Sequence, residues 1–353
     1  MDRRPEASAI AAEAADRDEH AAFDRSVAEV AVEVASRAPS IHNTQPWSWE
    51  FGADGLALRA DRSRQLVVAD PDGHSLMISC GAALTLTEVG LRAAGWTVTT
   101  LRLPDSNDPE LLARFSNPRR MQVSETDRGR VAAALRRHSD RRPFSLEPIP
   151  DEALESLRAA ADGDGVHVHF PTREEERVNL AVAVSWADRI ERHDAEYVAE
   201  MARWLRDEEV HADGVPLTAV PKVAAGHPRH TDVPLRDFEL GVSGRELIEQ
   251  DVDEHPVIAV LLADSDSPLQ QLHAGEAMMK LMIQAEIIGV ASCPLSQAVD
   301  LVAFRSRLQA LMDWQAYPQM MLRLGYPSAP TGPTSRAPRR SVRSMLHDSD
   351  VRP

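Results

Sequence analysis

The chain has 353 residues, 43% of them hydrophobic and 27% charged, and a formal net charge of −16. These values are typical of a soluble globular protein with one large or two medium domains, and the acidic balance argues against nucleic acid as the main partner. Only two cysteines occur, Cys80 and Cys293, which excludes a disulfide framework or a cysteine zinc site and favours the reducing cytoplasm. We expect no membrane span and no signal peptide, because no apolar run approaches the required length and residues 1–20 lack an apolar core.

The first informative element is a turn, Ala38–Trp47, between an expected helix and an expected strand at Trp47–Phe51. Its sequence, APSIHNTQPW, combines two prolines, which fix backbone φ, with serine, amide and imidazole side chains. Such a turn is suited to grip a flat polar ring. The alternative is an ordinary loop after a helix.

The next elements occur twice. Leu66–Asp72 (LVVADPD) resembles Val260–Asp266 (VLLADSD), and in each copy two glycines bracket an expected helix. The bracketing glycines are Gly81 and Gly95 in the first copy and Gly275 and Gly289 in the second. Each copy is predicted to form a buried strand, an Asp-containing turn and a long helix. Both helices are rich in small or apolar residues, so we expect them to pack on each other as the centre of a pseudo-dimer.

The pattern predicts two α+β halves, residues 21–125 and 126–330, followed by a C-terminal extension, 331–353. Further strands are expected at Val98–Leu103 and Met320–Leu324, and a helix at Ala153–Ala161. Residues 204–241 have several prolines and weak apolar periodicity, which is typical of a lid or a binding loop. His227 and His230 within this segment have metal-ligand spacing but lack a third ligand, so we predict no metal site.

A cationic motif follows the expected helix Thr126–Arg136. Arg137, His138, Ser139 and Arg141 bring together guanidinium, imidazole and hydroxyl groups, which are suited to bind phosphate; a solvated basic turn is the alternative. A second basic group, SRAPRR at 335–340, either reaches the same phosphate or forms a disordered tail. Neither the turn nor the cationic motif is duplicated, which indicates a single composite site between the halves. No dinucleotide fingerprint or P-loop is present.

In their order along the chain, these motifs resemble the nitroreductase superfamily of FMN flavoproteins, and more narrowly its Acg-type branch. The resemblance covers about Ser26–Arg340. It depends on the turn, the RHSxR motif, LGYP at 324–327, ADPDG at 69–73 and SCGAAL at 79–84. It implies a nitroreductase-like α+β fold whose two halves form an intramolecular pseudo-dimer with one FMN between them.

The resemblance also assigns residues to the cofactor. It implies that the phosphate and ribityl chain are held by Arg137, His138, Ser139 and Arg141, with Arg336 as the C-terminal arginine. It implies that the ring contacts Pro39, Ser40, Ile41 and Asn43, with Gln45 supporting the turn, and Pro294, Leu295, Ser296 and Gln297 along its N5 edge. The flavin N5 carries the chemistry, so no catalytic side chain is assigned. On this interpretation Arg137 and Asn43 must be close enough to touch a common ligand.

Two functions of different classes remain open. One is an NAD(P)H-dependent oxidoreductase that passes electrons to a small acceptor such as a nitroaromatic or a quinone. The other is an FMN-sequestering protein whose lid covers the flavin and prevents turnover. A non-flavin anion-binding protein is a third possibility. The expected partners are FMN, NAD(P)H and the acceptor, in a monomer with a pseudo-dimer core or in a homodimer.

Overall fold

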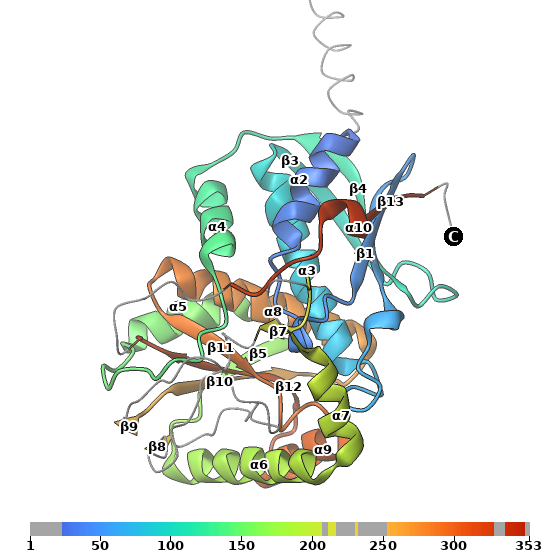
Figure 1. The fold of residues 1–353 in the computed structure, drawn as a ribbon. Coiled ribbons are helices and arrows are strands. Elements are labelled where there is room, and N and C mark those ends of the chain that lie inside the picture. Colours follow the sequence, from blue (N-terminus) through green and yellow to red (C-terminus); the bar gives the residue numbers. More distant parts are fainter. Residues whose placement is uncertain (1–22, 207–210, 217–229, 232–252, 328–335, 350–353) are drawn as a thin grey trace, which may run out of the picture.

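The computed structural model describes residues 23–206, 211–216, 230–231, 253–327 and 336–349. Two sheets of mostly antiparallel strands flank a central pair of long helices (Figure 1), and one continuous core cluster includes residues from both sheets and both helices. The first half contains α2 (Arg25–Ala35), β1 (Trp47–Gly52), β2 (Gly55–Ala60), α3 (His74–Ala93), β3 (Trp96–Arg102) and β4 (Leu111–Arg120). The second contains α4 (Glu125–Arg136), α5 (Asp151–Ala161), β5 (Val166–His169), α6 (Glu174–His193), α7 (Ala195–Trp204), β10 (Val257–Ala263), α8 (Pro268–Ile287), β11 (Ala291–Leu295), α9 (Val302–Met312) and β12 (Tyr317–Gly325).

The remaining elements are short. Single turns form η1 (Ile41–Asn43) and η2 (Arg62–Arg64), and two-residue strands form β6 (Leu205–Arg206), β7 (Val215–Pro216), β8 (His230–Thr231) and β9 (Asp253–Glu254). The chain continues to α10 (Val342–Met345) and β13 (Leu346–Asp348). The predicted α+β class is confirmed, as are the strands at β1, β3 and β12 and the helices at α4 and α5.

The two halves share one sheet topology. The strands of the first sheet run in the order β13-β1-β2-β4-β3, and those of the second in the order β11-β12-β10-β5. If β5, β10, β12 and β11 are matched to β1, β2, β4 and β3, the order is the same, and every neighbouring pair within the matched strands is antiparallel. In both halves the central helix connects the second strand of this series to the strand at its far edge.

The helices α3 and α8 are equivalent elements that meet at two glycines. Each has 20 residues, and each is followed by a glycine with positive φ, Gly95 at 82° and Gly289 at 78°. An added Cβ on Gly81 would lie 3.0 Å from the Cα of Gly275, and one on Gly275 would lie 2.9 Å from the Cα of Gly81. The predicted packing of these helices is therefore confirmed, and their backbones approach so closely that no side chain fits between them.

Local sequence explains where these helices begin. At α8 the Ser267 hydroxyl accepts from the backbone N–H of Gln270, and Pro268 occupies the first helical position, where its missing N–H costs nothing. At α4 the side chains of Ser124 and Asp127 form a reciprocal capping box. At α3 the Asp70 carboxylate accepts from the N–H groups of Ser75 and Leu76.

The predicted strand at Leu66–Ala69 is wrong. These residues form turns, whereas the matched residues Val260–Ala263 lie in β10. The true counterpart of β10 is β2, which ends at Ala60, well before α3. Here the consecutive N–H groups of Val67, Val68 and Ala69 donate to the Glu200 carboxylate on α7 instead of to a neighbouring strand.

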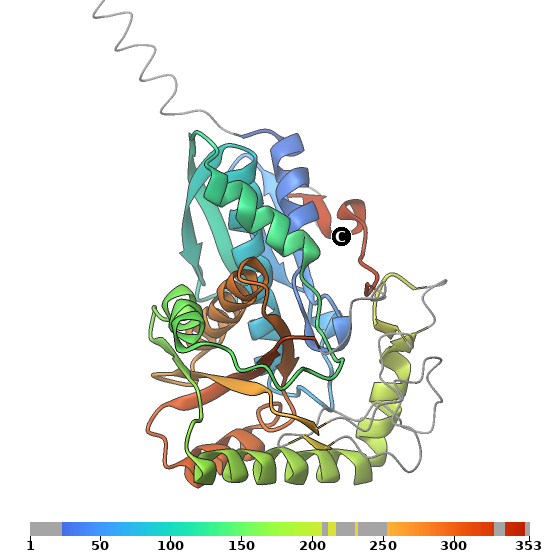
Figure 2. The same ribbon diagram turned by 90° about the vertical axis from the view of Figure 1, so that its left-hand side faces the viewer.

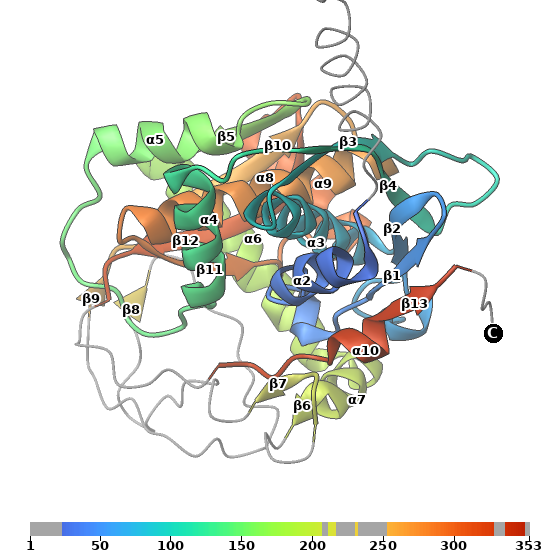
Figure 3. The same ribbon diagram turned by 90° about the horizontal axis from the view of Figure 1, so that it is seen from above.

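The C-terminal segment returns to the first half. In the residues assigned to a C-terminal extension, 331–353, the structure places α10 and β13, and β13 pairs in parallel with β1 at the edge of the first sheet. Figure 3 shows this red segment beside the blue β1. The helix α6 lies at the end of the second half that is farthest from the five-stranded sheet (Figure 2).

The helix α3 corrects one expectation from the sequence. Among the described residues it is the single helix whose length and composition would allow it to cross a membrane, although we expected no such run. Within the structure 83% of its most apolar window is buried, as for the core helix of a globular fold.

The glycine crossing generates the first prediction. Replacing Gly275 by alanine would put Cβ 2.1 Å from the carbonyl oxygen of Ile78, so one helix must shift. We expect Gly275→Ala to lower the free energy of unfolding by about 2–3 kcal/mol, measured by urea denaturation. Gly129→Ala in α4 is the matched control, because an added Cβ there meets nothing within 4 Å. It should leave stability unchanged or raise it by up to about 1 kcal/mol. If the two substitutions changed the free energy of unfolding equally, the close contact of α3 and α8 at Gly275 would be contradicted.

Candidate functional site

Two adjoining pockets lie between the halves and share the residues Pro39, Ser40, His42, Ser139 and Arg141. Their empty space amounts to about 780 and 750 Å³, a figure that includes space open to solvent. We call them the apolar pocket and the cationic pocket after the side chains that are particular to each. Because they share a wall, they form one elongated cleft.

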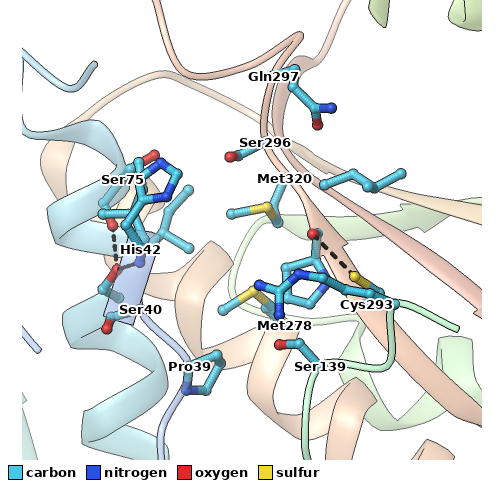
Figure 4. A pocket seen from close by; sticks show the side chains of 16 residues that line it. Pro39, Ser40, His42, Ser75, Ser139, Met278, Cys293, Ser296, Gln297 and Met320 are labelled. Atoms are coloured by element: carbon cyan, nitrogen blue, oxygen red, sulfur yellow. Dashed lines mark hydrogen bonds between the residues drawn. The ribbon is translucent and has the colours of Figure 1, made fainter. Parts of the chain in front are cut away.

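The apolar pocket takes its walls from both halves. In Figure 4, Ser40, His42 and Ser75 lie on one side and Met278, Met320 and Cys293 on the other. The remaining lining residues come from the turn, from α3, from the cationic motif, and from the end of β11 and the loop after it; they are Pro39, Ile41, Ile78, Ser79, Ser139, Arg141, Pro294, Leu295, Ser296 and Gln297. Broad apolar side chains with a few hydroxyl groups between them suit a flat ring that also carries polar atoms.

The cationic pocket is lined by Arg37, Arg137, His138, Arg336 and Arg339, and none of its described lining residues is acidic. Arg137 is only 7% exposed. Its Nη2 donates to the carbonyl oxygen of Arg37 (2.7 Å), but its buried Nε and Nη1 have no hydrogen-bond partner. Burial lowers the pKa of Arg137 to about 10. Such a buried and partly unsatisfied guanidinium is costly unless an anion is bound beside it.

Arg339 adds a second buried guanidinium. Its Nη1 donates to Asn43 Oδ1 (2.9 Å), while its buried Nε has no partner. The pKa of Arg339 is lowered to about 9. Burial is the main cause, and the positive charges of Arg137 and Arg37 contribute to the same shift. Arginines that repel one another inside a pocket without acids create a strong preference for a multivalent anion.

The turn that forms the shared wall has an unusual backbone. His42, Asn43 and Gln45 all have positive φ, at 45°, 55° and 51°. For a residue other than glycine this left-handed conformation costs about 1–2 kcal/mol, and less for asparagine. The hydroxyls of Ser40 and Ser79 hold it, because they accept from the backbone N–H groups of Gln45 (3.0 Å) and Ile41 (3.2 Å). Strain of this kind is typical of functional sites.

Asn43 joins this turn to two distant segments. Its Nδ2 donates to the carbonyl oxygens of Gly214 (2.9 Å) and Pro338 (3.0 Å), and its Oδ1 accepts from Arg339. Gln45 makes similar connections, donating to the carbonyl oxygen of Ala212 (2.9 Å) and accepting from the backbone N–H of Arg340 (2.9 Å). The segments 211–216 and 336–340 are therefore fixed to the rim of the cleft.

The structure brings most of the predicted site residues together. Those at the apolar pocket are Pro39, Ser40, Ile41, Ser139, Arg141, Pro294, Leu295, Ser296 and Gln297, and those particular to the cationic pocket are Asn43, Arg137, His138 and Arg336. Gln45 lines neither pocket and supports the turn. Arg137 and Asn43 both line the cationic pocket, and Asn43, which the resemblance assigned to the ring, does not line the apolar pocket.

Sequence reasoning missed several lining residues. Arg37 and Arg339 are the main ones, together with the wall residues Ser75, Ile78, Met278 and Met320. The basic group 335–340 was a usable signal for Arg339, but composition does not say which of its arginines enters the pocket. Met278 and Met320 are almost fully buried and also form a pocket wall.

The proposed lid, residues 204–241, is described only in part. Residues 211–216 contact the turn, Asp213 pairs with Arg64, and Val215 and Pro216 line the cationic pocket. His227 and most of this segment lie outside the described residues. Within the residues that are described, no group of three potential metal ligands occurs.

Comparisons with known proteins show which family the chain belongs to. The family model described as "Nitroreductase family" matches residues 134–326, which include the cationic motif and the second half. A Mycobacterium tuberculosis H37Rv protein named "Putative NAD(P)H nitroreductase acg" is 31% identical over 91% of this chain and 95% of its own length. Another protein of that strain, "Putative NAD(P)H nitroreductase Rv3131", is 31% identical over 92% of each chain.

Among solved structures, a Bacteroides fragilis nitroreductase with bound FMN matches 58% of this chain and 93% of its own, with 13% identity and a TM-score of 0.35. The family match and the extent of the mycobacterial matches establish that the chain belongs to the nitroreductase family, in its Acg-type branch.

The Asn43 connections generate the second prediction. Asn43→Gly should lose the three side-chain hydrogen bonds while relieving the positive φ, and Asn43→Ala should lose the bonds and keep the strain. We expect both to lower stability, the alanine variant by about 1 kcal/mol more, in chemical denaturation. Limited proteolysis should cleave near 336–340 faster in both variants. An alanine variant as stable as wild type would show that Asn43 does not hold this rim.

Proposed function

We propose that the chain is an FMN-dependent oxidoreductase that uses NAD(P)H to reduce a small acceptor. One observation carries the proposal: a single cleft between the halves has apolar walls at one end and buried arginines with unsatisfied nitrogens at the other. FMN has the same polarity along its length, with a flat aromatic ring at one end and a phosphate carrying close to two negative charges at the other.

The residues present fit this cofactor. Arg137 and Arg339 would hold the phosphate together with His138 and Ser139, and a bound phosphate would supply the acceptors that the unpartnered guanidinium nitrogens lack. The ring would lie between the turn and the walls formed by Met278, Met320 and Leu295.

When bound, FMN supplies the hydride chemistry, and the protein supplies binding, orientation and electrostatics. The apolar walls exclude water from the ring. The strained turn would present Pro39 and Ser40 to the ligand from the first half, while the end of β11 and the residue after it would present Leu295 and Ser296 from the second. Because both halves are rigidly joined through α3 and α8, these contacts are preorganised before the cofactor binds.

The mycobacterial relatives carry nitroreductase names, and no observation supports the alternative of FMN sequestration without turnover. We therefore expect the purified protein to be yellow, with a flavin-to-protein ratio near one. NADPH with a quinone or a nitroaromatic should give steady-state turnover above that of free FMN. Tightly bound flavin with no such turnover would favour sequestration, and a colourless protein that does not take up FMN would contradict both flavin functions.

The cationic pocket generates the third prediction. We expect Arg137→Ala to weaken FMN binding about ten- to hundredfold, the loss of a buried charged hydrogen bond, and Ser139→Ala to weaken it less. Riboflavin, which lacks the phosphate, should bind wild type and Arg137→Ala alike. Quenching of flavin fluorescence on titration measures both affinities.

Arg130→Ala is the matched control for this prediction. Arg130 lies on α4, the helix that ends just before Arg137, but is exposed to solvent and lines neither pocket. Its removal should leave both affinities unchanged. If Arg137→Ala binds FMN as wild type does, the phosphate assignment is wrong.

A further inference from the structure

A fully buried ion pair lies in the second half, outside the two pockets. Arg323 on β12 and Glu254 on β9 are both 0% exposed, and Arg323 Nη2 donates to Glu254 Oε2. We call them the buried pair. Taking two charges out of water is costly, and apolar side chains of similar volume often give equal or greater stability at such positions. The other contacts of the buried pair therefore say more about its role than its presence in the core does.

The buried pair holds the backbone just after the cationic motif. Nη1 and Nη2 of Arg323 both donate to the carbonyl oxygen of Arg142, each at 3.3 Å. The Glu254 carboxylate accepts from the backbone N–H of Phe144 at 2.8 Å. Hydrogen bonds to charged groups are stronger and more directional than those between neutral groups. Two strands of the second half thus fix one short segment, residues 142–144, through its backbone.

The side chain of Phe144 fixes the same segment. This ring is fully buried, and the Cζ atom of Arg323 lies 4.0 Å from its centroid, a cation–π contact. An added Cβ on Gly325 would lie 2.5 Å from the Cδ2 atom of the ring, so glycine allows the ring to reach the backbone of β12. The backbone N–H of Ser145 then donates to the carbonyl oxygen of Tyr326 at 2.7 Å. Phe144 is therefore held by its ring as well as by its backbone.

The fixed segment directly follows the wall that the two pockets share. Ser139 and Arg141 line both pockets, and the next residue along the chain is the first one held by the buried pair. Residues 137–143 form no helix or strand, so attachments to neighbouring elements determine their course. On the other side of Arg141, the backbone N–H of Asp140 donates to the carbonyl oxygen of Ser292 at 3.0 Å. The shared wall is thus held from both ends.

We propose that Arg323 and Glu254 are positioning residues for the phosphate of FMN. By holding residues 142–144, they keep Ser139 and Arg141 at the shared wall. Both members of the buried pair are fully buried and line neither pocket, so they act through this segment and not by contact with a ligand. Binding groups must be held to within about 0.5 Å of their productive geometry by the residues behind them. This inference rests on the proposed function, because the ligand is taken to be FMN.

The test replaces both charges of the buried pair together, Arg323→Met with Glu254→Met, so that no unpaired charge is left in the core. Quenching of flavin fluorescence measures the affinity of the full chain for FMN and for riboflavin, which lacks the phosphate. We expect the affinity for FMN to fall about tenfold, the equivalent of one charged hydrogen bond. The affinity for riboflavin should stay near the wild-type value. A pair that only stabilised the fold would change both affinities in the same proportion.

Gly325→Ala is an independent variant that changes no charge. Its Cβ would collide with the Phe144 ring, so the ring and residues 142–144 must shift although both members of the buried pair are still present. We expect it to lower the affinity for FMN by a smaller factor and to leave the affinity for riboflavin unchanged. This variant decides the question even if the double methionine variant does not fold.

The matched control is a second ion pair with a buried carboxylate. Arg102 on β3 donates to Glu276 on α8 through two bonds of 2.7 Å, Glu276 is 1% exposed, and neither residue lines a pocket. Arg102→Met with Glu276→Met should keep the wild-type ratio of the two affinities. An unchanged ratio in the folded double variant of the buried pair or in Gly325→Ala, or an equal change in the control, would overturn the inference. Failure of wild type to bind either flavin would instead overturn the proposed function.

Discussion

The close contact between α3 and α8 is the constraint on which the site depends. At Gly81 and Gly275 the backbones of the two helices are in contact. No side chain lies between them at this point, so the distance between the helices is at its minimum. Both helices also supply pocket walls, Ser75 and Ile78 from α3 and Met278 from α8. The spacing of the helices therefore sets the width of the apolar pocket, and a shift at the crossing would reach the ligand directly.

The cationic pocket shows a different balance of forces. Arg137 and Arg339 are kept near each other without an acid between them, and the turn that borders them holds three residues at positive φ. Both features are unfavourable in the free protein. The surrounding fold maintains them through the hydrogen bonds of Asn43, Gln45 and Ser40. A bound anion would remove the electrostatic part of this cost, so occupancy and stability should rise together.

Much of this could be predicted from the sequence, because the signals were local. The turn, the cationic motif and the glycines that follow the two long helices depend on neighbouring residues and appear where expected. The predicted starts of these helices are wrong, because α3 and α8 begin seven residues before Gly81 and Gly275, which lie inside them. The strand at Leu66–Ala69 failed because a short apolar run does not specify its pairing partner, and here Glu200 satisfies the backbone instead. The sequence did not predict the pairing of β13 with β1 or the burial of Arg339. Both depend on contacts between residues that are far apart in the chain. Local sequence patterns and composition do not predict such long-range contacts.

The path of the C-terminal segment has a consequence for biosynthesis. Arg340 donates its backbone N–H to Gln45 across 295 residues, and β13 completes the sheet that β1 begins. On the ribosome, the wall formed by the turn emerges early, while the segment that carries Arg339 is translated after all the other described residues of the cleft. A nascent chain can therefore assemble both sheets' inner strands and still lack one side of its anion pocket. The anion pocket is therefore complete only when the segment 336–340 has docked on the turn.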